Sequence, residues 1–174
     1  MSKLPTIFLS YNSGSDLEET LAVRLHTIGA VHGFRMLLPD RYDNSELVSA
    51  ETRNRIVMSD YFILFSTSVL GAQVQEEIAI AFQHLNDKSK IIVIFDRHKG
   101  KNIHGADNCT QIYIDSRAES TQQILERILA ELKSKEIRKP TKKQTSTEDI
   151  VGGILLAGLG LLVLGALLDN GKGK

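Results

Sequence analysis

Residues 61–95 read YFILFSTSVLGAQVQEEIAIAFQHLNDKSKIIVIF, and this stretch decides the fold. Its two ends, residues 61–66 and 90–95, are dominated by aliphatic and aromatic side chains, which is typical of buried strands. Between them, apolar residues recur at helical spacing over residues 72–86. A strand, a helix and a second strand in this order indicate two parallel strands joined by a crossover helix.

The same alternation continues toward the N-terminus. We expect strands at residues 6–11 and 34–38, and a helix at residues 45–60. Another helix should begin after Ser15, because Ser15 and Glu18 have the spacing of a capping box. Two further βα units therefore precede the central stretch.

Toward the C-terminus we expect a fifth strand at residues 110–114 and a last helix, opened by a capping box of Ser116 and Glu119. Ile124, Ile128 and Leu132 lie on one stripe of that helix. Five strands alternating with helices predict an α/β fold of the flavodoxin-like type. Its five-stranded parallel sheet has the order 2-1-3-4-5, is flanked by helices, and binds ligands at the carboxyl ends of its strands.

Composition excludes several classes of protein. The 174 residues include 21 basic and 21 acidic side chains, so no basic field is available and we expect no nucleic-acid partner. A single cysteine, Cys109, excludes an internal disulfide framework and a two-cysteine metal site. The five histidines show no pair at metal-ligand spacing, and we expect no metal site.

The composition also changes along the chain. We expect a globular domain at residues 1–135, a basic and polar linker at 136–149, an apolar segment at 150–168 and a polar tail at 169–174. The nineteen residues of the apolar segment carry no charged or polar side chain. As a helix they would span about 28 Å, roughly the hydrocarbon thickness of a bilayer. The alternative, a buried core helix, normally has a polar face that this segment lacks.

The apolar segment predicts a single-pass transmembrane helix, with the lipid bilayer as a partner. No apolar signal region precedes the first strand, so insertion should depend on this C-terminal anchor. The basic residues lie just before the segment, which favours a cytoplasmic location for the globular domain. The same residues could instead hold the linker against anionic lipid headgroups.

Glu77 is the leading candidate for chemistry. The expected helix at residues 72–86 has a buried stripe, and helical spacing places Glu76 opposite that stripe, as a solvated surface acid. Glu77 lies at the border of the stripe, where it can lean into the crevice and stabilise positive charge developing on a sugar. The alternative is a carboxylate that only satisfies the helix dipole. The stripe consists of Val74, Ile78, Ala81, Phe82 and Leu85.

Two loops should meet at the same crevice. Residues 12–15 fit either a phosphate-binding turn or an ordinary strand-to-helix turn. Three acidic residues in the next helical turn favour the ordinary turn, because they already satisfy the helix dipole. The hydroxyls of residues 66–68 can bond a ligand or cap the next turn, and no neighbouring His or Lys marks them as nucleophiles. The acidic residues are Asp16, Glu18 and Glu19.

Several motifs, in their order along the chain, resemble those of a Toll/interleukin-1 receptor (TIR) domain. IFLSY at residues 7–11 is similar to the family's opening strand, and GFR at 33–35 with LPD at 38–40 is similar to its second strand. EIAIA at residues 77–81 is similar to the Glu-Ile-x-x-Ala motif that carries the catalytic glutamate of the NAD-cleaving members. The resemblance covers residues 5–132.

This resemblance implies that NAD+ is the substrate, that no cofactor is used, and that Glu77 is catalytic. In those members the glutamate engages the ribose next to nicotinamide as the glycosidic bond breaks. Nicotinamide leaves, and ADP-ribose or a cyclic isomer forms. The resemblance also implies self-association through TIR domains. The implied substrate-binding residues are Phe8, Ser10, Tyr11, Asn12 and Ser66.

The chain departs from the family pattern at three places. Gln73 stands where the family often has a tryptophan, and residues 41–46 lack the glycine that is usual after the second strand. Asn12 and Ser13 replace basic residues that commonly follow the first strand.

The first hypothesis is a membrane-anchored NAD+ glycohydrolase, a microbial immune or cell-death effector activated by assembly. The second is a non-enzymatic TIR module whose assembly clusters transmembrane helices for signalling or membrane disruption, which the departures favour. The third is an enzyme similar to nucleoside deoxyribosyltransferases, which also use a glutamate on a related sheet.

Overall fold

The computed structural model describes residues 3–41, 47–99, 103 and 105–137. These residues form an α/β fold with one five-stranded, all-parallel sheet in the order β2-β1-β3-β4-β5, as the alternation of the sequence predicts. The strands are β1 (Thr6–Ser10), β2 (Arg35–Leu37), β3 (Tyr61–Ser66), β4 (Ile91–Asp96) and β5 (Thr110–Ile114). The α-helices are α1 (Asp16–Gly29), α2 (Ala50–Val57), α3 (Ala72–His84) and α4 (Thr121–Ile137). The 3-10 turns are η1 (Ala30–His32), η2 (Lys88–Lys90) and η3 (Ala106–Asn108).

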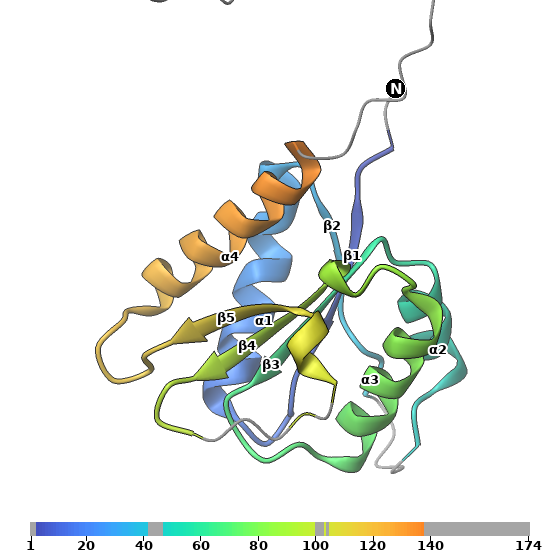
Figure 1. The fold of residues 1–174 in the computed structure, drawn as a ribbon, viewed down its shortest axis with the longest axis horizontal. Coiled ribbons are helices and arrows are strands. Elements are labelled where there is room, and N and C mark those ends of the chain that lie inside the picture. The colour runs from blue at the N-terminus through green and yellow to red at the C-terminus, as the bar shows by residue number, and fades with distance from the viewer. Residues whose placement is uncertain (1–2, 42–46, 100–102, 104, 138–174) are drawn as a thin grey trace, which may run out of the picture. The chain divides into compact units, whose positions relative to one another are not determined.

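Helices cover both faces of the sheet, with α1 and α4 on one face and α2 and α3 on the other (Figure 1). Successive side chains of a strand point to opposite faces. Ile7 and Leu9 of β1 therefore join the core beneath α1 and α4, whereas Phe8 joins the core beneath α2 and α3. The stripe predicted for the last helix is buried: Ile124, Ile128 and Leu132 are at most 1% exposed.

One helix is predicted at residues 45–60, but α2 spans only Ala50–Val57. The prediction is therefore too long, because the described residues 47–49 and 58–60 lie outside the helix. The helix begins after Ser49, whose hydroxyl caps it by accepting the Thr52 N–H at 3.1 Å. It ends early because Asp60, the residue before β3, already bonds Thr6 of β1. The Asp60 N–H donates to the Thr6 carbonyl at 2.7 Å, and its carboxylate accepts the Thr6 N–H at 2.9 Å.

The predicted capping box of Ser116 and Glu119 is also wrong. The Ser116 hydroxyl donates to Asp96 at 2.5 Å, and the Glu119 carboxylate accepts the Asp115 N–H at 3.0 Å and pairs with Arg127 at 2.5 Å. The helix instead begins after Ser120, which exchanges hydrogen bonds with Gln123. The Ser120 N–H donates to Gln123 Oε1 at 2.8 Å, and the Gln123 N–H donates to Ser120 Oγ at 3.3 Å.

Among the helices of the described residues, none combines the length and apolar character needed to cross a bilayer. The predicted span at residues 150–168 and the tail at 169–174 lie outside the described residues, as does the linker at 136–149 apart from its first two residues. The anchor therefore stays a prediction.

Candidate active site at the carboxyl edge of the sheet

The chain leaves the carboxyl edge of the sheet in opposite directions after β1 and β3. β1 leads to the edge strand β2, and β3 leads to β4 on the other side. Such a switch point is where ligands bind in open α/β sheets. A cavity of about 530 Å³ lies here, between the loop after β1 and the start of α3. Its lining includes Asn12, Gly14, Arg41, Ser68, Gly71 and Gln73, and we call it the crevice.

Glu18 holds the two loops of the crevice together. It is completely buried, and its Oε1 accepts the Thr67 N–H at 2.8 Å, the Thr67 hydroxyl at 3.0 Å and the Ser68 hydroxyl at 2.8 Å. Its Oε2 accepts the Asn12 N–H at 2.8 Å. Besides complementing the helix dipole from the first turn of α1, Glu18 therefore joins the loops after β1 and β3. The predicted capping box is half formed, since only the Glu18 N–H bonds Ser15, at 3.5 Å.

Two N–H groups of the loop after β1 are used inside the protein, which favours an ordinary strand-to-helix turn over a phosphate-binding one. The Asn12 N–H bonds Glu18, and the Ser15 N–H donates to the Asn12 carbonyl at 3.1 Å. The Asn12 side chain fastens this turn to α3, accepting the Gly71 N–H at 2.9 Å and donating to Ser68 at 2.9 Å. Asn12 therefore shapes one wall of the crevice.

Glu77 is deeply buried rather than at the border of its helix. Glu77 is 1% exposed, and the hydroxyl of Ser10 donates to its Oε2 at 2.5 Å. The Arg41 guanidinium lies 3.1 Å from Oε1 and 3.4 Å from Oε2. Both carboxylate oxygens thus have a partner, one from β1 and one from the segment that follows β2.

Arg41 is the residue of this site that sequence reasoning missed. Besides contacting Glu77, its guanidinium donates to the Tyr11 carbonyl at 2.7 Å and to Gln73 at 2.6 Å, and lies 5.3 Å from the centre of the Tyr11 ring. Its position, four residues after the end of β2 at the carboxyl edge of the sheet, is the signal that could have found it. Arg41 connects Glu77 to the lining of the crevice.

Burial sets the ionisation of this cluster. It raises the pKa of Glu77 from 4.5 to about 7, and the opposing effects of Arg41 and the Ser10 hydrogen bond only reduce that rise. Burial also raises the pKa of Tyr11, against the lowering effect of Arg41. Glu77 is therefore a carboxyl group that changes its charge near neutral pH, as catalytic acids and bases often do.

Of the five predicted substrate-binding residues, Asn12 alone belongs to the described lining of the crevice. Ser10 and Tyr11 are buried beside it, where Ser10 contacts Glu77 and Tyr11 lies against Arg41. Phe8 is completely buried and stacks on the ring of Phe62, 5.7 Å away, in the core beneath α2 and α3. Ser66 is 5% exposed at the end of β3, where it pairs in register with Phe95.

The predicted description of Glu76 needs a correction. Instead of being a free, solvated surface acid, it is 32% exposed, accepts the Val48 N–H at 3.1 Å and pairs with Arg53 at 2.6 Å. Glu76 thus connects α3 to α2, while Glu77, one residue later, faces the sheet. In the part of the chain that the structure describes, no group of three or more His, Cys, Asp or Glu side chains could hold a metal ion.

No model of a known protein family matches this chain, and no curated protein matches it significantly. The TIR resemblance therefore stays a prediction, beside an observed fold and an observed site around Glu77.

Proposed function

We propose that this chain is an NAD+ glycohydrolase of the TIR type, with Glu77 as its catalytic carboxylate and no cofactor. The observation that carries the proposal is the setting of Glu77. It is a buried carboxyl group at the switch point of a parallel sheet, held by Ser10 and Arg41 next to a cavity of about 530 Å³. The predicted motif at residues 77–81 supports the same substrate.

The reaction breaks the bond between the nicotinamide nitrogen and the ribose carbon. Nicotinamide leaves as a neutral molecule with the bonding electron pair, and positive charge develops on the sugar. The ionised carboxylate of Glu77 stabilises this charge in a site from which water is largely excluded. Water then adds to the sugar carbon and loses a proton, which gives ADP-ribose; capture by an adenine nitrogen gives a cyclic isomer.

Substrate binding has to change the contacts of Arg41. Its guanidinium pairs with the Glu77 carboxylate, and Arg41 also lines the crevice. Arginine binds phosphate oxygens through two parallel hydrogen bonds, so the diphosphate of NAD+ can take the place of the carboxylate. Ser10 would keep its hydrogen bond and hold Glu77 in orientation. Of the predicted binding residues, Asn12 forms part of the wall, Tyr11 lies against Arg41, and Phe8 supports β1 from the core.

The wider role belongs to the same proposal. The segment at residues 150–168 would anchor the domain to the cytoplasmic face of a membrane, and self-association would raise the local concentration of active sites. A membrane-anchored enzyme that consumes NAD+ suits a microbial immune or cell-death effector activated by assembly.

The test is nicotinamide release from NAD+ by the full chain, clustered on liposomes. Glu77→Gln should lower the rate by about 10²-fold or more, because the developing charge loses its stabilising carboxylate. Glu76→Gln is the matched control, since it removes an adjacent acid whose contacts among the described residues are with α2 and the loop before it. Equal rates for Glu77→Gln and the wild type would contradict the proposal.

One observation favours the second hypothesis, the non-enzymatic TIR module. Glu77 is 1% exposed and both of its oxygens are partnered, as in an ion pair that only joins α3 to the rest of the fold. In that case Glu77→Gln would keep biological function, whereas a chain ending at residue 149 would lose it.

A further inference from the structure

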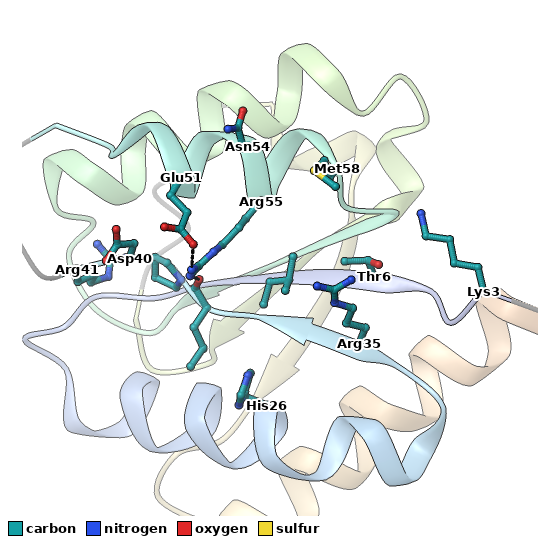
Figure 2. Close-up of a pocket in the computed structure, with 13 residues that line it drawn as sticks. Lys3, Thr6, His26, Arg35, Asp40, Arg41, Glu51, Asn54, Arg55 and Met58 are labelled. Carbon is teal, nitrogen blue, oxygen red and sulfur yellow. Dashed lines mark hydrogen bonds and ion pairs between the residues drawn. The ribbon is translucent and has the colours of Figure 1, made fainter.

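A second cavity, of about 740 Å³, runs along the edge strand β2. Figure 2 shows α2 on one side of it and His26 of α1 on the other, with Lys3 near one end and Asp40 and Arg41 at the other. Its volume lies in the range of small-molecule sites. We call it the β2 cavity.

One end of the β2 cavity carries positive charge without compensation. Lys3 and Arg35 lie toward the same end of β2 (Figure 2), and within the described residues neither side chain, nor that of His26, has an ion-pair partner. The remaining cations of the lining are engaged: Arg55 pairs with Glu51, and Arg41 with Glu77. This end therefore attracts an anion, and two basic side chains suit a phosphate group.

The opposite end offers a hydrogen-bond acceptor. Asp40 is half-buried and lines this end; its Oδ1 is closed off from solvent and accepts no hydrogen bond from any described residue. A buried carboxylate oxygen without a donor is costly, and an unfilled acceptor of this kind calls for a partner. Between the two ends the lining includes three apolar residues, Leu37, Leu38 and Pro39, opposite the Glu51–Arg55 pair of α2.

The edge of β2 does not suit an added peptide strand, which is the other occupant to consider for an unpaired edge. β2 has only three residues. Arg35 already donates its N–H to the Pro5 carbonyl, and the Leu38 carbonyl accepts from Arg55 at 2.7 Å. Too few free backbone groups remain for strand addition.

We propose that the β2 cavity binds a phosphorylated small molecule of about the size of a nucleoside monophosphate. The phosphate lies between Lys3 and Arg35, the apolar part of the ligand lies on residues 37–39, and a hydroxyl or amino group donates to Asp40. Glu77 is not part of this site, so the proposal stands whether or not the chain cleaves NAD+.

Titration calorimetry of the full chain in mild detergent tests the site, with AMP and inorganic phosphate as probes. Arg35→Ala should weaken the binding of both probes about tenfold or more, because it removes a charged donor to phosphate. Asp40→Ala should weaken the binding of AMP to a similar extent and leave the binding of inorganic phosphate unchanged. Asp40→Asn keeps an acceptor oxygen of the same shape and should retain AMP binding.

Arg117→Ala is the matched control. Arg117 is exposed beyond β5, at the opposite edge of the sheet, and the variant removes one positive charge without touching the β2 cavity. Three results would overturn the proposal: no AMP binding at millimolar concentration, AMP binding that Arg35→Ala leaves unchanged (as for a nucleotide in the crevice), or equal weakening by Arg117→Ala. Circular dichroism of each variant verifies that the fold is intact.

Discussion

Two arginine–glutamate pairs lie close together in the fold and differ in their surroundings. In the Arg41–Glu77 pair, the arginine side chain is 15% exposed and the glutamate 1%. In the Arg55–Glu51 pair, along the β2 cavity, the values are 32% and 62%. The first pair belongs to the crevice and the second to an open, solvated edge of the sheet.

The difference teaches that burial, rather than pairing, decides the chemistry of a carboxylate here. Desolvation raises the pKa of Glu77 to about 7 although a guanidinium lies 3.1 Å away. Solvent screens the exposed pair, so such a contact contributes little to stability. The expected effects of substitution follow this contrast, and they decrease from the buried edge to the solvated one.

The largest effect is expected at Glu18, the buried carboxylate that holds the two loops of the crevice. Glu18→Ala leaves the N–H groups of Asn12 and Thr67 without their acceptor, at about 1–3 kcal/mol each. We expect the free energy of unfolding to fall by about 4 kcal/mol, measured by urea denaturation of the full chain in detergent. Glu19→Ala removes a neighbouring exposed acid and should change it by less than about 0.5 kcal/mol. Equal effects of the two would show that Glu18 does not hold the crevice.

The second effect is on the pH dependence of stability. The pKa of Glu77 is higher in the folded chain, at about 7, than its ordinary value of 4.5, so the folded state binds more protons between these values. The protonated Glu77 carboxyl therefore makes its full contribution to the free energy of unfolding below pH 4.5. This contribution, about 3 kcal/mol, is lost as the pH rises toward 7. Unfolding curves at pH 4.5 and pH 7.5 should show this loss in the wild type, with a difference smaller by that amount in Glu77→Gln. Identical pH dependence in both proteins would mean that Glu77 titrates normally.

The third effect is on catalysis. If ionised Glu77 stabilises the transition state, nicotinamide release should fall about tenfold for each pH unit well below 7. Arg41 lowers the pKa of Glu77 in the free enzyme, so Arg41→Gln should move the midpoint of the pH profile of kcat/KM upward, whatever it does to the maximal rate. Arg53→Gln, at the exposed Glu76 pair, is the control and should leave the midpoint in place. A midpoint near pH 4.5 in the wild type would contradict the buried state of Glu77 during catalysis.

The smallest effect is expected at the solvated edge. Glu51→Ala removes the partner of Arg55, and the free energy of unfolding should change by less than about 0.5 kcal/mol. Arg55 keeps its hydrogen bond to the Leu38 carbonyl, so the wall of the β2 cavity should persist. If Glu51→Ala lowered the free energy of unfolding as much as Glu18→Ala, the solvated edge would not differ from the buried crevice in this respect.

The sequence alone determined the sheet. Apolar strands such as residues 61–66, alternating with amphipathic helices, bury their side chains well in a doubly wound parallel arrangement, and the predicted order 2-1-3-4-5 is observed. Helical spacing also placed Glu77 beside the buried stripe of its helix, because the face of a helix on which a residue lies follows from local geometry. The ends of the elements were less predictable: Ser116 and Glu119 fit a capping box by spacing, yet Glu119 pairs with Arg127 in the folded chain.

Only the tertiary structure decided which polar side chains the carboxyl edge buries and what they contact. Glu18 bonds Thr67, 49 residues away, and Glu77 bonds Ser10, 67 residues away. Arg41 joins Glu77 from a third segment of the chain. Periodicity reports the face of a helix on which a residue lies, but not its partner across the fold or its distance from solvent. Those distant contacts and the loss of water around them set the charge of Glu77, because desolvation acts only once the chain has folded.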